Sequence, residues 1–142
     1  MTRESVMTAL LALLTSGGTF LTSGRRVLPW NKVASQPALF LRHVGEQVSD
    51  RPTGMPARTI LECEAWIYNK VGGDEVPDTA LNALLDAVET LLLPSPADDA
   101  QTLGGVVQHC WIEGKTEIYP GDLDNQAIAV VPIRVLVPIL AG

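Results

Sequence analysis

The chain has 142 residues, of which 46% are hydrophobic and only 18% are charged, and its formal charge at pH 7 is −6. This length fits one domain over residues 1–142 with a core of its own. The acidic balance argues against a nucleic-acid-binding protein, which needs clusters of lysine and arginine, and the low charge content leaves neutral and apolar surface for contacts with other proteins.

A helix is predicted at the start of the chain, with Thr2 as its N-cap and its end near Leu14. A basic residue before an apolar run also resembles a secretory signal. However, Glu4 and Ser5 interrupt the basic start, so a helix of the folded domain is the favoured interpretation. The spacing i, i+4, i+7, i+8 of an amphipathic helix is carried by Val6, Leu10, Leu13 and Leu14.

The next part of the chain is rich in strand signals. Residues 19–27 predict a short strand, residues 37–44 a second strand, and residues 45–56 a polar loop with glycine and proline. Residues 58–71 predict the longest alternating strand. One face of it carries Leu61, Cys63, Ala65 and Ile67, and the other carries Ile60, Glu62, Glu64, Trp66 and Tyr68.

A second helix is the clearest element of the sequence. Residues 77–93 carry one apolar stripe, and Pro77 suits the first turn of a helix. A polar loop is predicted over residues 94–102. Residues 106–112 and 116–119 then predict a β-hairpin around a turn that contains glycine.

The last apolar run, residues 127–140, is predicted to form a closing strand over residues 126–138. Pro132 inside it indicates a sheet edge or a bulge. Two prolines and Arg134 interrupt the run, which is also too short to span a bilayer, so no membrane association is expected. The order helix, strands, helix, strands predicts an α+β fold, with an antiparallel or mixed sheet and two main α-helices packed on it.

The two cysteines predict buried free thiols in a reducing compartment, because two cysteines make no disulfide framework. Cys63 and Cys110 lie in predicted strands, and a zinc site that includes them with His43 or His109 would require the sheet to bring these residues together. None of the usual paired-ligand spacings is present. His109 and Cys110 are neighbours on a strand and so point to opposite faces.

Other patterns for chemistry are equally weak. Glu62 and Glu64 lie on one strand face without a third polar group, which is typical of a solvated or interfacial face. The glycine pairs match neither a phosphate-binding loop nor a dinucleotide-binding pattern, and no Gly-x-Ser-x-Gly occurs. No catalytic residue, cofactor-binding residue or metal ligand is therefore predicted, and the chain is not expected to be an enzyme.

Candidate interface residues are arginines and aromatic residues, which often anchor protein contacts, together with charged loop residues. These are Arg25, Arg26, Trp30, Arg51, Trp66, Tyr68, Asp98 and Asp99.

An order of short motifs along nearly the whole chain resembles a known family. The motifs are Arg3-Glu4-Ser5-Val6, Gly24-Arg25-Arg26, Gln36-Pro37-Ala38-Leu39-Phe40-Leu41, Trp66-Ile67-Tyr68, residues 81–89, residues 102–114 and Pro132-Ile133. Together they resemble the tail terminators (tail-completion, minor tail protein U-like) of long-tailed bacteriophages, prophages and gene transfer agents.

The resemblance implies a sheet with helices on one side and no catalytic residue. It also implies a structural virion protein that assembles in the bacterial host cytoplasm. Such proteins form a hexameric ring that caps the tail tube, ends polymerisation of the major tail tube protein and offers a docking surface to the head-tail connector protein. DNA is expected to pass through the lumen without specific binding.

Three alternatives stay open. One is another neck or minor tail component of the same fold. Another is a small metal-dependent enzyme that uses Cys63, His109 and nearby carboxylates. The third is a dimeric α+β binding module.

Overall fold

The structure, a computed structural model, describes residues 2–49, 58–72, 75–94, 99–119 and 125–137. Its elements in chain order are α1 (Arg3–Thr15), β1 (Thr22–Gly24), the short 3-10 helix η1 (Trp30–Lys32), β2 (Ala38–Ser49), β3 (Arg58–Lys70), α2 (Pro77–Leu91), β4 (His109–Ile112), β5 (Glu117–Tyr119) and β6 (Gln126–Val137). The six strands form one sheet in the order β1-β2-β3-β6-β4, and β5 also pairs with β6. Only β1 and β2 run parallel, so the sheet is mixed.

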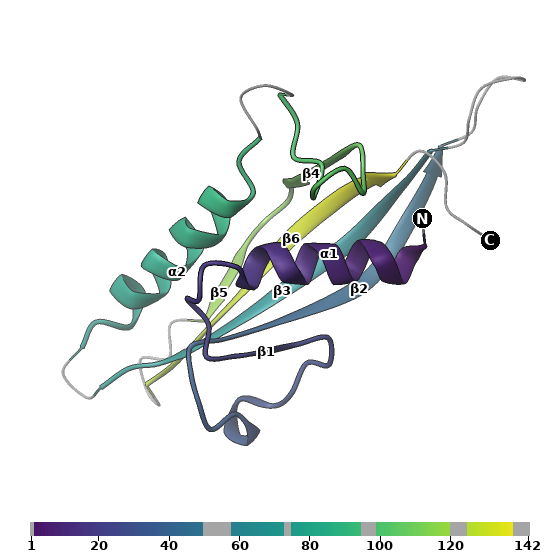
Figure 1. Cartoon of the computed structure of the whole chain (residues 1–142). Helices are drawn as coiled ribbons and strands as arrows, with labels where there is room; N and C mark the ends of the chain where they lie inside the picture. Colours follow the sequence, from purple (N-terminus) through teal and green to yellow (C-terminus); the bar gives the residue numbers. More distant parts are fainter. Residues whose placement is uncertain (1, 50–57, 73–74, 95–98, 120–124, 138–142) are drawn as a thin grey trace, which may run out of the picture.

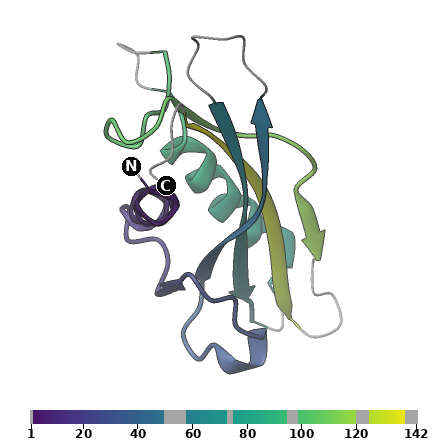
Figure 2. The ribbon, with the colours of Figure 1, turned by 90° about the vertical axis from the view of Figure 1, so that its right-hand side faces the viewer.

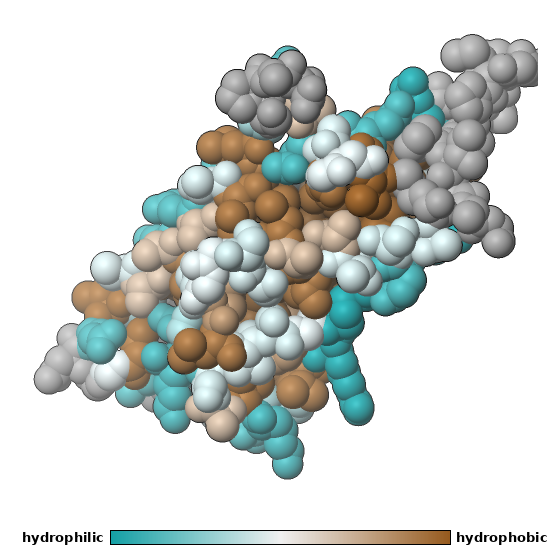
Figure 3. All heavy atoms as spheres, in the orientation of Figure 1, coloured by the Kyte–Doolittle hydropathy of each residue, from teal (hydrophilic) through white to brown (hydrophobic). Residues whose placement is uncertain are grey.

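Both α-helices lie on the same face of this sheet (Figures 1 and 2). Helix α1 packs over β2, and α2 packs over β3 and β6. Figure 3 shows hydrophobic residues at the surface over the middle of the helix-bearing face and hydrophilic residues mainly near its margins. The predicted α+β class is confirmed.

The start of α1 is fixed by a capping box. Thr2 Oγ1 accepts a hydrogen bond from the Ser5 amide at 3.1 Å, and Ser5 Oγ accepts one from the Thr2 amide at 2.9 Å. Two of the amides that a helix leaves unpaired at its N-terminus are thereby satisfied, and the predicted N-cap is confirmed. Neither of the two α-helices in the described residues combines the length and hydrophobicity needed to cross a bilayer.

Helix α2 follows its sequence pattern closely. Pro77 occupies the first turn, where its missing N–H costs nothing, and Leu81, Leu84 and Val88 are buried against the sheet. The core lies between the helices and the inward-facing residues of the sheet. Those of β3 and β6 include Leu61, Cys63, Ala65, Ile67, Ala127, Ala129, Val131, Ile133, Val135 and Val137.

The predicted hairpin of residues 106–119 is wrong. β4 and β5 do not pair with each other, since both run antiparallel to the same side of β6. They are separated at Pro132, whose carbonyl accepts a hydrogen bond from the Glu113 amide at 3.3 Å. Proline offers no N–H on this side of β6, so β4 and β5 pair with β6 on either side of Pro132. The predicted sheet edge or bulge at Pro132 is wrong, because β6 is a central strand and its register with β3 continues unbroken through Pro132.

The predicted loop over residues 45–56 is wrong for its first five residues, because β2 continues to Ser49. The register with β3 shifts between His43 and Gly45, which leaves Val44 as an extra residue on β2. Such a bulge absorbs the irregularity around Gly45 without ending the strand. Residues 50–56 lie outside the described part of the chain.

Candidate interaction surface

The face of the sheet opposite the helices carries a network of charged and aromatic side chains. Arg42 Nε donates to Glu64 Oε1 at 3.0 Å, and its guanidinium lies 5.5 Å from the centre of the Trp66 ring. Trp66 Nε1 also donates to Glu64, at 3.2 Å. Glu62 accepts a hydrogen bond from Gln47 at 2.8 Å. Strand alternation places Glu62 and Glu64 on one face, but different partners hold the two carboxylates. This arrangement fits an ordered surface rather than a carboxylate pair for acid–base chemistry.

The same face continues towards β4. Arg134 of β6 forms a salt bridge of 2.6 Å with Glu113, and Glu113 also accepts a hydrogen bond from Trp111 Nε1 at 3.1 Å. Trp111 stacks on the His109 ring, with centroids 5.2 Å apart. The Arg134–Glu113 contact links β6 to the end of β4, and the other two contacts order side chains along β4.

Tyr68 does not contribute exposed surface, which corrects the expectation that it lies on an open face. Its side chain points away from the helices, but the chain between β1 and β2 folds over it, so Tyr68 is only 3% exposed. It packs with Phe40 and Val33, and its hydroxyl donates to the Leu28 carbonyl at 2.6 Å. Burial raises the pKa of Tyr68 above its usual value.

The remaining predicted interface residues are not brought together. Arg25 forms a salt bridge of 2.8 Å with Glu4 of α1, and its buried Nε has no hydrogen-bond partner among the described residues. Arg26 is exposed, Trp30 lies in η1 with 41% exposure, and Asp99 is exposed after α2. The other two predicted residues, Arg51 and Asp98, lie outside the described part of the chain.

A charged cluster near the N-terminus of α1 was missed by the sequence reasoning. Arg3 forms a bidentate ion pair with Glu46 of β2, and His43 Nε2 lies 3.3 Å from the same carboxylate. The hydrogen bond from Arg3 is the main cause that holds the pKa of Glu46 below its usual value. The sequence analysis expected residues 46–49 in a loop. It therefore gave no indication that Glu46 lies on a strand beside Arg3.

The cysteines are free and buried, as predicted, and they do not form a centre with histidine. Burial raises the pKa of both Cys63 and Cys110 to about 12. The Cys63 thiol lies 3.5 Å from the Met7 sulfur, and His109 accepts a hydrogen bond from the Gln101 amide. In the described residues, no group of three His, Cys, Asp or Glu side chains is placed to hold a metal ion.

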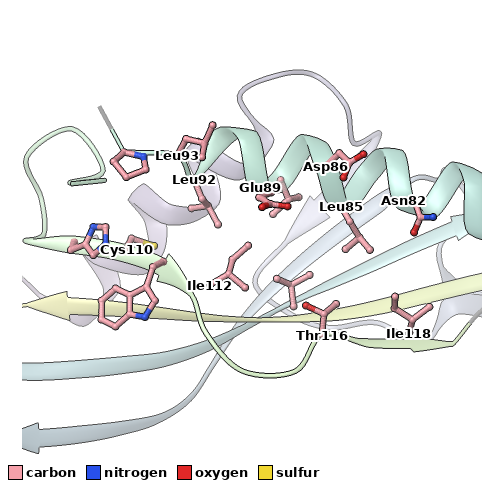
Figure 4. A pocket seen from close by; sticks show the side chains of 15 residues that line it. Asn82, Leu85, Asp86, Glu89, Leu92, Leu93, Cys110, Ile112, Thr116 and Ile118 are labelled. Atoms are coloured by element: carbon pink, nitrogen blue, oxygen red, sulfur yellow. The ribbon is translucent and has the colours of Figure 1, made fainter. Parts of the chain in front are cut away.

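An apolar hollow lies between α2 and strands β4 and β5 (Figure 4). It is an open groove of about 590 Å³. Leu85, Leu92 and Ile112 point into it, and Ile118 of β5 is 46% exposed at its side. Its polar lining on α2 is Asn82, Asp86 and Glu89. An open apolar groove with an acidic margin is a candidate protein-docking surface.

The comparisons with known proteins bear on the fold. A chain of a solved structure described as "Virion of native gene transfer agent (GTA) particle" superposes on this chain with a TM-score of 0.52 and 15% sequence identity. The superposition covers 89% of this chain and 83% of that chain. No protein-family model and no curated protein matches the sequence. At this identity, the likeness shows a shared fold.

Proposed function

We propose that this chain is a non-enzymatic structural protein of a phage-like particle. The observation that carries the proposal is the shared fold with a chain of a gene transfer agent virion, which extends over most of both chains. The order of motifs that resembles tail terminators supports it independently. The surface networks also support it, since their carboxylates are engaged with arginine, glutamine and indole groups rather than gathered around an open reaction site.

Within that class, we infer that the chain is a tail terminator. It forms a hexameric ring at the end of the tail tube, stops addition of the major tail tube protein and presents a docking surface to the head-tail connector protein. The low charge content and the open groove beside α2 support a protein that works through contacts. A net charge of −6 supports a lumen through which DNA passes without being bound.

Native mass spectrometry across a concentration series, with negative-stain imaging of the same samples, tests the proposal. A closed ring of six subunits with a central hole is the expected result. Isolated tail tubes are then supplied, and the protein is expected to cap one end and stop further growth. The end of a tail tube acts as a template that favours assembly of the ring. A monomer in dilute solution therefore does not by itself contradict capping.

The alternatives predict different outcomes. Specific binding to a neck component with no effect on tube growth would favour another neck or minor tail protein. A strict dimer at every concentration that leaves tubes uncapped would favour a binding module. Stoichiometric metal after purification would favour the metal-dependent enzyme.

A further inference from the structure

The last strands of the sheet are left partly uncovered on the face that carries the helices. Helix α2 packs over β3 and β6, and both β4 and β5 pair with the side of β6 that faces away from β3. Neighbouring strands lie about 4.8 Å apart, whereas packed helices lie about 8–10 Å apart. The next helix beside α2 would therefore stand over β4 and β5. Neither α-helix of the described residues fills this place, and the open groove lies there (Figure 4).

The groove has an apolar floor with the length of a short helix. Leu85 on α2 and Ile112 on β4 point into it, and both are half-buried. Towards its two ends, Leu93 is 58% exposed and Ile118 is 46% exposed (Figure 4). The lining on the helical side lies within residues 82–94, which span about 18 Å at a rise of about 1.5 Å per residue. A partner helix of about 14 residues covers this length.

One margin of the groove is acidic. Asn82, Asp86 and Glu89 are spaced i, i+4, i+7 and so form one row along α2. Asp86 and Glu89 are exposed, and no described residue forms a salt bridge with either of them. The described residues that line the groove include no lysine or arginine. A partner that covers the apolar floor must therefore bring cations to this row, since displacing water from two uncompensated carboxylates is unfavourable.

The two α-helices of the described residues do not have the complementary pattern. Helix α1 contains one basic residue, Arg3, which pairs with Glu46, and its apolar residues pack against its own sheet. Helix α2 contains no lysine or arginine. A second copy of this chain therefore offers no basic amphipathic helix from the described residues, and the complementary helix belongs to a different protein.

We propose that the groove binds an amphipathic helix of another protein. The apolar face of that helix lies on Leu85, Ile112 and Ile118, and its lysine or arginine side chains follow the row of Asp86 and Glu89. Cations three or four residues apart on the partner match the spacing of this row. Docking here needs neither ring closure nor contact with the tail tube, so it goes beyond the proposed function and does not rest on it.

A displayed peptide library tests the chemistry of the partner. Its helical peptides of about 14 residues share an apolar stripe and carry lysine, glutamine or glutamate at the flanking positions. Lysine-flanked peptides are expected to be selected, and their glutamate-flanked counterparts are expected to bind about 30-fold more weakly. Fluorescence anisotropy measures the affinities, and the advantage of lysine is expected to shrink at high salt.

Charge reversal on α2 locates the site. In the groove variant, Asp86→Lys with Glu89→Lys, glutamate-flanked peptides are expected to bind more tightly than lysine-flanked ones. The control variant, Glu75→Lys with Asp78→Lys, makes the same change in net charge at exposed positions that do not line the groove. Its preference is expected to stay with lysine, because exposed charges more than about 10 Å away are largely screened. Circular dichroism checks that each variant is folded.

Three outcomes would overturn the proposal: no helical peptide binds the wild type, the preference does not reverse in the groove variant, or it reverses equally in the control. If the groove variant instead loses self-association in the absence of any peptide, the groove is a contact between copies, and the helix of another protein is excluded. Capping of supplied tail tubes by the wild type is measured separately, so these outcomes are distinguishable from failure of the proposed function.

Discussion

Alkaline pH is predicted to destabilise this protein through its two buried thiols. In the unfolded chain a cysteine has a pKa of 9.0, and burial raises the pKa of both Cys63 and Cys110 to about 12. Between these values the unfolded chain loses protons that the folded protein keeps. The free energy of unfolding therefore falls as the pH rises above 9 and is fully retained below it.

The magnitude follows from the two pKa values. At pH 10, a thiol with a pKa of 9.0 when unfolded and about 12 when folded lowers the free energy of unfolding by about 1.4 kcal/mol. The two thiols together lower it by about 2.8 kcal/mol at pH 10, against only about 0.1 kcal/mol at pH 8. Other groups contribute to the pH dependence as well, so the comparison needs a variant without the thiols.

The assay is urea unfolding at pH 8 and pH 10, in reductant and at low protein concentration, followed by tryptophan fluorescence. The wild type is compared with the double variant Cys63→Ala and Cys110→Ala. The variant is expected to start less stable, since each change removes a buried sulfur, but to lose about 2.7 kcal/mol less than the wild type between the two pH values. Equal losses in the two proteins would refute the reasoning, because they would mean that the folded state does not hold the thiols protonated.

Three further predictions concern stability. Tyr68→Phe removes the buried hydroxyl that donates to the Leu28 carbonyl, and a loss of about 1–3 kcal/mol is expected in urea unfolding. Leu81→Ala leaves a cavity under α2, since Leu81 is fully buried, and a loss of about 2–5 kcal/mol is expected from thermal unfolding. Gly114→Ala is expected to cost about 1–3 kcal/mol, because Gly114 has φ of 118° and an added Cβ would lie 3.3 Å from Pro132 Cγ.

The controls for Tyr68→Phe and Leu81→Ala are the same changes made at exposed positions. Tyr119 is 52% exposed and bonds only to neighbouring Glu117 among the described residues, so Tyr119→Phe is expected to change stability by less than about 0.5 kcal/mol. A loss at Tyr119 as large as that at Tyr68 would show that burial of the hydroxyl is not the cause. For Leu81, a matched change at exposed Leu93 is expected to be nearly neutral in the monomer.

The elements with strong periodicity were predicted well. The apolar stripe of α2 and the alternation in β3 indicated the core-facing side of each element, because both patterns report directly on one buried face. Thr2 was recognised as an N-cap because capping depends on neighbouring residues only. These features are local, and the sequence carries them explicitly.

The errors arose where distant segments meet. The turn around Gly114 suggested that β4 and β5 pair with each other, but a turn signal does not identify the partner, and both strands pair with β6. Tyr68 alternates onto the outer face as predicted, yet its burial depends on Leu28 and Val33 folding back from another part of the chain. The groove of α2 was missed for the same reason, since helix and strands form it together.

The position of β6 has a consequence for how the protein reaches its fold. β6 lies at the centre of the sheet, between β3 on one side and β4 and β5 on the other, although it is the last of the six strands in the sequence. Until β6 has been synthesised, one edge of β3 has no partner, and β4 and β5 have no strand to join. During synthesis the nascent chain therefore exposes open strand edges that can pair with other chains, and the sheet is completed in one late, long-range step.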